Sequence, residues 1–262
     1  MCNLYTVRKT AEEVARYFGV ANPVKSNTPE EVYPGTPGLV VTEQDGSREI
    51  RSMTWGFPLR LKTMKRDAKP IPVNNIADLT KAMWVGVARK PQWRCLIPVT
   101  HFAEPEGPKG SKTRTWFSLP DEPIFAWGGL WRMSDEWGPV YSGAMTAANE
   151  AVSPVHDRMP VILHRDDYER WMTGSLDDLL AFQQRVYPSE LMEMERTNDL
   201  WVKKKGSGAE DAALLFYAAA HHLKLGGGAT AFNRKGTRSK ALTLATDETI
   251  GTTTAACCWI CS

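Results

Sequence analysis

The residue with the most reactive side chain, Cys2, lies one peptide bond from the start of the sequence. If Met1 is removed, Cys2 carries two nucleophiles on one carbon, a thiol and an α-amine. An α-amine titrates at about 7.7 to 8.0, so a useful fraction is neutral at cellular pH, and a thiolate is strongly nucleophilic. The amine can therefore form a Schiff base with an aldehyde, and the thiol can close that product into a thiazolidine.

Two other interpretations of Cys2 stay open at this point. In an N-terminal nucleophile hydrolase, the α-amine serves as base for the thiol and the substrate is an amide. Glutamine amidotransferases also begin with Met-Cys, but they usually continue with glycine and carry an arginine-histidine signature, neither of which this sequence has. The third interpretation is an incidental cysteine after the initiator.

Three further polar residues lie at the edges of apolar runs, where catalytic groups are commonly displayed. Asn75 lies in "IPVNNIADL", Glu104 ends "CLIPVTHFAE" and His156 lies in "SPVHDRMPVIL". A carboxylate that follows a buried strand can have a raised pKa and move protons, but it can equally be an ordinary surface group. His156 with Asp157 and Arg158 is also typical of a structural turn held by ion pairs.

The composition indicates a globular protein without a general affinity for anions. The 262 residues are 42% hydrophobic and include 10 Trp, and the formal net charge is only +2. Any anionic partner must therefore meet local basic patches. The stretch "RLKTMKRDAK" is one, and a solvated charged loop is its alternative interpretation. Its cations are Arg60, Lys62, Lys65, Arg66 and Lys69.

The chain has no signal-peptide pattern and no run of about 18 apolar residues, so we expect a cytoplasmic protein. The cysteines form no disulfide framework, and the terminal "CCWIC" with His221 and His222 matches no reliable zinc pattern. We therefore expect neither a metal nor a cofactor. The cysteines are Cys2, Cys95, Cys257, Cys258 and Cys261.

The secondary-structure signals predict an α+β fold. Thr10, Glu13 and Gly19 predict a capped helix over 11–18. From about 37 to 164, short β-rich runs separated by Gly and Pro predict a curved, mostly antiparallel sheet or barrel-like core. Two more helices are expected, in "RDDYERWM" and in "LDDLLAFQQRVY", the second with Ser175 as its N-cap.

The character of the sequence changes after about residue 200. The stretch "AEDAALLFYAAAHHLKLGGG" predicts a helix closed by glycines, and residues 235–262 show no periodicity, as in a flexible tail. We therefore expect a domain over 1–200 and an extension of unknown role over 201–262.

Taken together, the motifs are similar to those of one known family. "MC", "TWGFP", "RCLIPVTHFAEPEG", "FAWGGLW", "TAANEAVSPVHDRMPVIL" and "YERWM" occur in the order and approximate spacing of the SRAP family, the SOS response-associated peptidases. The resemblance covers roughly residues 2–190, and "MC" with "HDRMP" is its most discriminating part. It implies the SRAP fold, with flanking helices around the sheet.

The resemblance also implies a reaction and a set of catalytic residues. Family members shed Met1, apparently by their own activity, and crosslink Cys2 to abasic sites in single-stranded DNA through a thiazolidine. Cys2 matches the nucleophile, and Asn75 matches the asparagine that orients the cysteine and the sugar. Glu104 matches the acid that assists sugar opening and proton transfer. His156 matches the histidine that holds the sugar hydroxyl and shuttles protons.

The same resemblance implies the DNA-binding residues. The segment "WGFP" resembles a family loop that wedges beside the lesion and stacks a base, and nearby cations would follow the phosphates. Core packing is the alternative for Trp55. The expected DNA-binding residues are Trp55, Gly56, Phe57, Pro58, Arg60, Lys62 and Arg158. The expected partner is single-stranded DNA with abasic sites, bound by a monomer without an obligate protein partner, nucleoid-associated when on DNA.

Three departures from the family pattern stand out. Asn3 and Leu4 replace the common "GR" after Met-Cys, and Pro105 replaces an aromatic residue after the glutamate. Ala77 occupies the position of an arginine two residues after the asparagine. Loss of that arginine puts affinity for DNA in doubt more than it does the chemistry.

Overall fold

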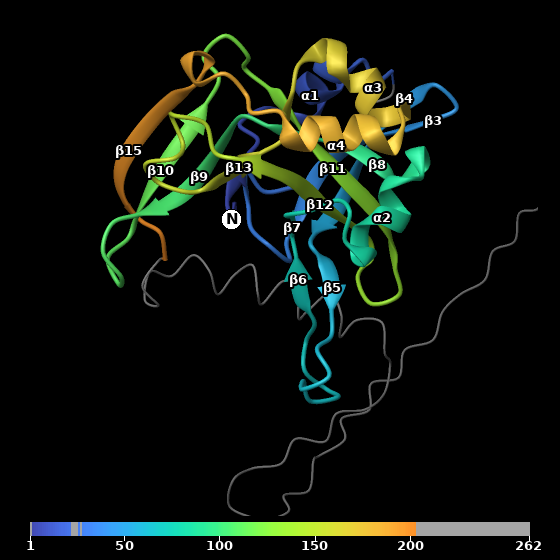
Figure 1. Cartoon of the computed structure of the whole chain (residues 1–262), viewed down its shortest axis with the longest axis horizontal. Helices are drawn as coiled ribbons and strands as arrows, with labels where there is room; N and C mark the ends of the chain where they lie inside the picture. Colours follow the sequence, from blue (N-terminus) through green and yellow to red (C-terminus); the bar gives the residue numbers. More distant parts are fainter. Residues whose placement is uncertain (1, 22–25, 27, 203–262) are drawn as a thin grey trace, which may run out of the picture. The chain divides into compact units, whose positions relative to one another are not determined.

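The protein's computed structural model describes residues 2–21, 26 and 28–202, and these form a mixed structure dominated by strands (Figure 1). The helices are α1 (Ala11–Phe18), α2 (Ala82–Ala88), α3 (Tyr168–Thr173) and α4 (Leu176–Gln184). Short 3-10 helices span Pro91–Trp93, Arg165–Asp167 and Ser189–Leu191. The strands are β1 (Tyr5–Thr6), β2 (Glu31–Val32), β3 (Pro37–Gln44), β4 (Ser47–Trp55), β5 (Phe57–Leu59), β6 (Ile71–Val73), β7 (Asn75–Ile76), β8 (Arg94–Val99), β9 (His101–Glu106), β10 (Thr113–Ser118), β11 (Phe125–Ser134), β12 (Gly138–Ala147), β13 (Arg158–Pro160), β14 (Ile162–Leu163) and β15 (Glu193–Leu200).

Five strands close into a barrel at the centre of this structure. β3 pairs with β4 and β8, β8 pairs with β11, and β12 pairs with both β11 and β4. Only the β4–β12 contact in this ring is parallel. The prediction of an α+β fold with a mostly antiparallel, barrel-like core is therefore confirmed.

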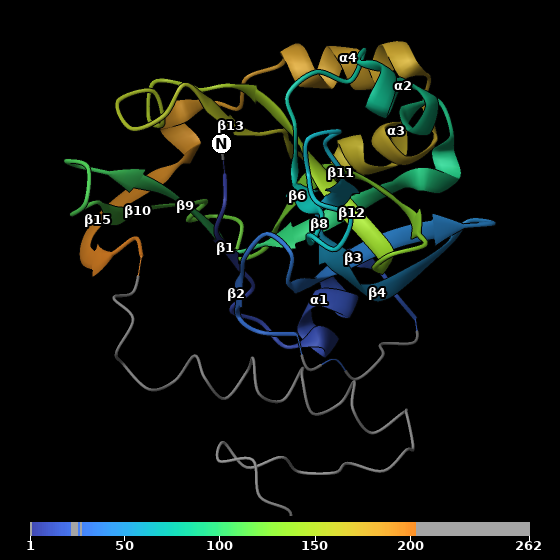
Figure 2. The same cartoon turned by 90° about the horizontal axis from the view of Figure 1, so that it is seen from below.

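A second sheet carries the beginning of the chain. Its strand order is β15-β10-β9-β1-β2, and each neighbouring pair is antiparallel. β9 begins two residues after β8 ends. The first part of the run "RCLIPVTHFAE" is therefore a strand of the barrel, and its last part is a strand of this second sheet. Figure 2 shows β1 between β9 and β2, the two strands with which it pairs.

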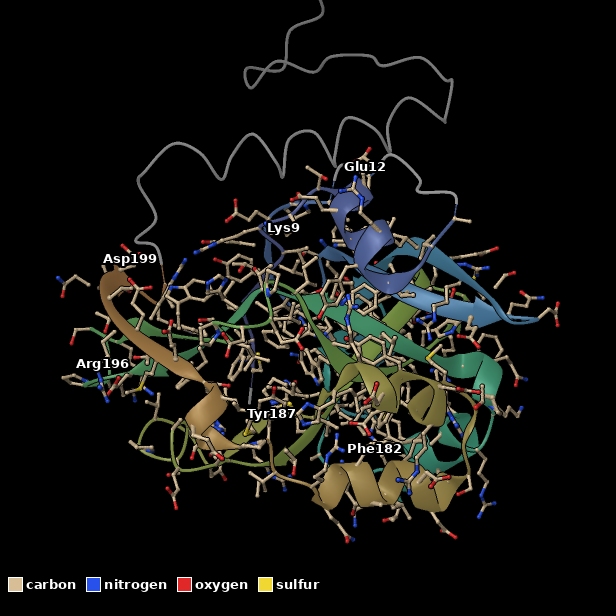
Figure 3. The ribbon with its side chains drawn as sticks, turned by 90° about the horizontal axis from the view of Figure 1, so that it is seen from above. Lys9, Glu12, Phe182, Tyr187, Arg196 and Asp199 are labelled. Atoms are coloured by element: carbon tan, nitrogen blue, oxygen red, sulfur yellow. The ribbon has the colours of Figure 1, made fainter. Side chains whose placement is uncertain are left out.

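Helices cover the sheets from opposite sides, with α1 on one side and α4 on the other (Figure 3). The predicted caps of α1 are confirmed: Thr10 and Glu13 form the capping box, and Gly19 ends the helix in the left-handed conformation, with φ 70°. Ser175 caps α4 as predicted. These local signals set the helix ends because they satisfy backbone groups within one turn.

Two predicted helices differ in extent from those observed. "RDDYERWM" begins with the 3-10 turn Arg165–Asp167, and only Tyr168–Thr173 is α-helical. The helix after Ser175 ends at Gln184, three residues before the end of its predicted segment. In the second segment the apolar pattern persists beyond the helix because Tyr187, which follows it, is also buried.

Two elements had no clear sequence signal. The segment of α2, "AMWVGVA", is short and contains valines and a glycine, but its Trp84 packs against Phe57 with ring centroids 4.9 Å apart. The segment of β15, "EMERTNDL", is mostly polar because this edge strand is largely exposed and pairs only with β10. Tertiary packing overrides weak propensity in both cases.

The predicted C-terminal helix and the cysteines at 257, 258 and 261 lie outside the described residues. Among the helices that are described, each is too short or too polar to cross a membrane.

One buried cation ties two helix ends to the barrel. Arg94, at the start of β8, is 1% exposed, and its guanidinium donates to the carbonyls of Ala88, Trp171 and Gly174 at 3.1, 3.1 and 2.7 Å. These carbonyls lie at the C-terminal ends of α2 and α3, where helix dipoles favour a positive charge. Arg94 therefore satisfies carbonyl groups that helix ends leave unpaired.

We expect Arg94→Met to lower the free energy of unfolding by about 3 kcal/mol, because it leaves several buried carbonyls without donors. Urea denaturation followed by circular dichroism measures the change. The matched control is Arg16→Met on the exposed face of α1, for which we expect about 0.5 kcal/mol or less. Equal losses in the two variants would contradict the role given to Arg94.

Candidate active site

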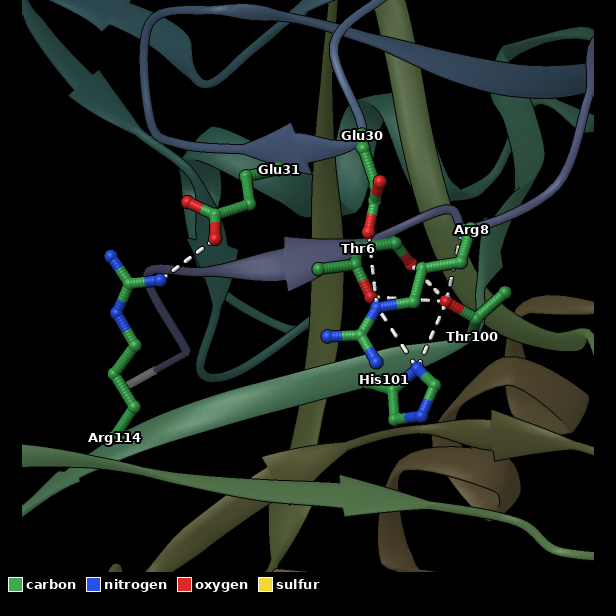
Figure 4. A network of polar contacts seen from close by, with 7 residues as sticks. All are labelled: Thr6, Arg8, Glu30, Glu31, Thr100, His101 and Arg114. Atoms are coloured by element: carbon green, nitrogen blue, oxygen red, sulfur yellow. Dashed lines mark hydrogen bonds and ion pairs between the residues drawn. The ribbon is translucent and has the colours of Figure 1, made fainter. Parts of the chain in front are cut away.

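The chain's first strand is bonded firmly to β9. The amide of Ala103 donates to the carbonyl of Leu4 at 2.9 Å, and the amide of Thr100 donates to the carbonyl of Thr6 at 2.8 Å. The hydroxyl groups of Thr6 and Thr100 are 3.0 Å apart, beside His101 (Figure 4). These bonds place the residues before β1 against the same strand that carries the predicted acid.

Two neighbouring asparagines hold the backbone of Cys2. Its carbonyl accepts from Asn75 Nδ2 at 2.7 Å and from Asn74 Nδ2 at 3.0 Å. The asparagines are positioned by β12: Asn75 pairs with Gly143, whose amide donates to the Asn74 carbonyl at 3.1 Å. Asn74 also reaches Asn3 Oδ1 at 3.1 Å. The sequence motif singled out only Asn75. The neighbouring asparagine in "NN" was the signal that could have identified Asn74 as the second residue that holds Cys2.

Glu104 is a buried carboxyl group without a hydrogen-bond partner. It lies on β9, its exposed fraction is 0%, and neither oxygen meets a donor among the described residues. Burial, with an added contribution from the Asp157 charge, raises its pKa to about 7. A group of this kind is costly to keep and is typical of functional sites. Both of its protonation states are populated at neutral pH.

The Cys2 side chain is fully buried, and its thiol contacts the carbonyl of Leu4 at 3.5 Å. Burial raises the pKa of this thiol well above its usual value, and the charge of Glu104 raises it further. A negative charge on Glu104 therefore disfavours ionisation of the thiol, which requires the two groups to lie near each other. The sulfur is held as a neutral thiol until a base takes its proton.

His156 lies in the loop between β12 and β13. Asn149 folds this loop by accepting from the Val152 amide at 3.0 Å, and the Ala148 amide donates to the Asp157 carbonyl at 3.0 Å. The side chain of His156 is 22% exposed, so it lies at the rim of the site rather than in its interior.

Two contacts at Nδ1 of His156 require opposite protonation states. The Arg158 amide donates to Nδ1 at 3.0 Å, whereas the Asp157 carboxylate, also at 3.0 Å, would favour a protonated Nδ1. Burial lowers the pKa of His156, so the ring is neutral at pH 7 and Nδ1 accepts from Arg158. The ring proton then lies on Nε2, which makes His156 a hydrogen-bond donor at that atom.

Arg158 lies beside Ala77, the position at which the family pattern has an arginine. Its Nη1 donates to the carbonyl of Ala77 at 2.9 Å, and Arg158 is half-buried. A guanidinium group therefore lies beside Ala77 although residue 77 carries no charge.

A family model described as SOS response associated peptidase (SRAP) matches residues 1–200. The chain belongs to the SRAP family. It is 25% identical over 207 residues to the abasic site processing protein YoqW of Bacillus subtilis (strain 168), a match that covers 74% of this chain and 90% of YoqW. It is 25% identical over 224 residues to the abasic site processing protein YoaM of the same organism, covering 80% and 96%.

Solved structures with the same fold are known. A crystal structure of a protein from Bordetella bronchiseptica superposes with a TM-score of 0.63 at 22% identity, covering 75% of this chain and 99% of that one. A crystal structure from Bacteroides thetaiotaomicron gives a TM-score of 0.61 at 19% identity, covering 74% and 91%. At this level of identity the likeness supports the fold alone.

The sequence leaves base stacking and core packing open for Trp55 in the loop of the SRAP pattern, and the structure places this residue in the core. Trp55 is fully buried, packs edge-on against Tyr5 and Trp127, and donates from Nε1 to the Asn74 carbonyl at 3.0 Å. Phe57 is fully buried as well. A ring without an exposed face cannot stack on a base, so Trp55 instead supports one of the asparagines that hold Cys2.

The other residues of this loop have different surroundings. Gly56 has a φ of 121°, and a Cβ there would lie 2.5 Å from Pro72, so only glycine fits. Pro58 is half-buried, and Lys62 is exposed. Arg60 is exposed, but its Nε lies 2.7 Å from Glu136 Oε1, which already neutralises its charge.

A surface pocket of about 750 Å³ lies near α1, and its lining includes Arg8, Thr10 and Glu30 but none of Cys2, Asn75, Glu104 and His156. Among the described residues, groups of His, Cys, Asp and Glu with the arrangement of a metal site are absent. The arrangement of Cys2 and Glu104 instead suits nucleophilic attack with proton transfer.

We expect the buried charge of Glu104 to make stability fall as pH rises. The raised pKa means that the folded state keeps a proton between pH 4.5 and about 7 that the unfolded state has lost. This group therefore costs about 3 kcal/mol of folding free energy at pH 8 and almost nothing at pH 4.5. Glu104→Gln removes the charge with little change in shape.

Urea unfolding of both proteins at pH 5 and pH 8 tests this expectation. Glu104→Gln should be more stable than the natural protein at pH 8, and the difference should shrink strongly at pH 5. A difference of the same size at both pH values would contradict a raised pKa. The matched control is Glu12→Gln on the exposed face of α1, which should leave the pH dependence of stability unchanged.

Proposed function

We propose that this SRAP-family protein crosslinks covalently to abasic sites in single-stranded DNA. The observation that carries the proposal is the pairing of a fixed Cys2 with the unpartnered, buried carboxyl group of Glu104. The relatives named as abasic site processing proteins support the choice of substrate. An abasic deoxyribose exposes an aldehyde when its ring opens, and an amine next to a thiol captures aldehydes.

The first step of the proposal is hydrolysis of the bond between Met1 and Cys2. One water molecule is consumed, methionine leaves, and Cys2 gains a free α-amine. Because Glu104 lies beside Cys2 and has a pKa of about 7, it can take a proton from the attacking group and return it to the departing amine. The family's self-cleavage would then be this single event.

The second step opens the sugar. An abasic deoxyribose is mostly a closed hemiacetal, so a base must take the anomeric hydroxyl proton while an acid protonates the ring oxygen. Glu104 can act as the base in its ionised form, and the Nε2 proton of His156 can bond to the sugar oxygen at the rim. The open form presents its aldehyde to the amine of Cys2.

The third step forms the crosslink. The α-amine adds to the aldehyde carbon, and loss of one water gives a Schiff base. The thiol of Cys2 then adds to that carbon and its proton passes to the nitrogen, which closes the five-membered thiazolidine. Asn75 holds the Cys2 carbonyl throughout, and its own Oδ1, which has no partner among the described residues, can accept from the amine or sugar.

The lesion must reach a residue that lies below the surface. The sugar is therefore proposed to flip out of the strand and to enter beside His156 and Arg158. Arg158 and Lys62 are proposed to contact phosphates, with a monomer as the acting form. The protein would act in the cytoplasm and on the nucleoid when it is bound to DNA.

We expect the natural protein to form a heat-stable adduct with a single strand carrying one abasic site, visible as a shifted band on a denaturing gel. The matched control, Cys2→Ser, keeps an amine but has no thiol, so its Schiff base should survive heating only after borohydride reduction. Undamaged DNA should give no adduct.

Intact-protein mass spectrometry reports in parallel whether Met1 has been removed. Absence of the adduct from protein that lacks Met1 would overturn the proposal. It would favour an N-terminal nucleophile hydrolase acting on an amide, which is the alternative that Cys2 leaves open.

We expect Asn75→Ala to slow crosslinking about a hundredfold at saturating DNA, because the nucleophile loses its alignment. The control is Asn3→Ala, whose side chain accepts from Asn74 and does not hold the Cys2 carbonyl, and it should change the rate less than about threefold. Single-turnover gel kinetics give both rates, and thermal unfolding checks that both variants fold. Equal rates for the two variants would contradict a positioning role for Asn75.

A further inference from the structure

A hairpin carries an unusual concentration of positive charge. β5 and β6 form a separate two-stranded sheet, joined by residues 60–70, of which residues 60–69 are called the basic finger below. Figure 1 shows the hairpin projecting away from the barrel. The basic finger contains five Lys or Arg residues and one acid, Asp67, so ten residues carry a formal charge of +4, against +2 for the whole chain.

The basic finger is an ordered segment. The guanidinium of Arg60 donates to the carbonyls of Ala68 and Arg66 at 2.8 and 3.4 Å, which closes the segment across its base. The same side chain pairs at 2.7 Å with Glu136, in the turn between β11 and β12. Arg60 therefore fixes the finger to the body of the protein, and Glu136 neutralises its charge.

The remaining cations of the finger point to solvent without acidic partners. All four are exposed, and within the described structure none of them forms an ion pair. Elsewhere, many arginines are paired with carboxylates, as Arg48 is with Glu43 and Arg185 is with Asp167. The four cations are Lys62, Lys65, Arg66 and Lys69.

We propose that the basic finger binds the phosphate backbone of the DNA strand that flanks the lesion, outside the catalytic site. The inference rests on the proposed function for naming DNA as the partner. Clustered, unpaired cations on an ordered projection favour a polyanion because each contact releases a counterion from the nucleic acid. Arg60 holds the finger in place, and the other four cations contact phosphates.

The reach of the hairpin places this contact away from the lesion. Seven residues separate Phe57 from Met64, and a strand rises about 3.3 Å per residue, so the tip lies up to about 20 Å beyond the barrel. A strand of about five nucleotides centred on the lesion would leave most of the finger unused, whereas one of about 25 would engage it.

The test compares salt dependence of binding in two variants of the full chain. The finger variant carries K65Q, R66Q and K69Q, and the matched control variant carries R16Q, R51Q and K81Q on other elements. Fluorescence anisotropy with undamaged single strands of about 25 and about five nucleotides gives the slope of log K against log salt. Each phosphate contact adds about 0.7 to that slope.

On the long strand we expect the finger variant's slope to fall by about 2. Between 50 and 200 mM salt, the natural protein should then lose about twentyfold more affinity than the finger variant. The control variant and all short-strand slopes should change by less than about 1. An unchanged long-strand slope would overturn the proposal, as would an equal fall in the control variant or on the short strand.

The crosslinking rate separates this inference from the proposed function. At saturating abasic DNA, the finger variant should crosslink at the natural rate, because its substitutions lie outside the site. If the natural protein forms no crosslink, the proposed function fails, and the slope difference still decides whether the finger binds the backbone. A slower rate at saturation would overturn the assignment of the finger to binding alone.

Discussion

The structure depends on the pairing of β1 with β9. A chain end is ordinarily frayed, but here backbone bonds at Leu4 and Thr6 join the first strand to the sheet, and two asparagines hold the carbonyl of Cys2. Because β9 also carries Glu104, the same pairing brings the nucleophile and the acid together. In the proposed reaction, the two groups would therefore be aligned before a substrate arrives, which spares that reaction an entropic cost.

This arrangement has a thermodynamic cost that the rest of the fold must offset. A buried carboxyl group without a donor destabilises the folded state whenever it is ionised. The closed barrel and its aromatic core supply burial around the site, and Arg94 satisfies helix ends that would otherwise add to the unpaired groups. Stability and reactivity are thus provided by different parts of one domain.

Charge and chemistry are likewise separated in space. The site itself relies on neutral amides, a protonatable carboxyl group and a neutral imidazole, whereas the densest positive charge lies on the projecting basic finger. Trp55 serves the site from inside the core, where its indole bonds to the backbone of Asn74. The charge of the basic finger can therefore change without disturbing the hydrogen bonds that hold Cys2.

The sequence by itself determined the helix caps at Thr10 and Ser175 and the succession of strands in the barrel. It also determined the family of the chain, through motifs that contain Cys2 and Glu104. Caps and turns depend on neighbours a few residues away, so local patterns suffice for them. Only the tertiary structure decided that Trp55 is buried and that charged β15 is a strand. Such outcomes depend on which distant segments meet, since burial and edge pairing arise from long-range contacts that no local pattern specifies.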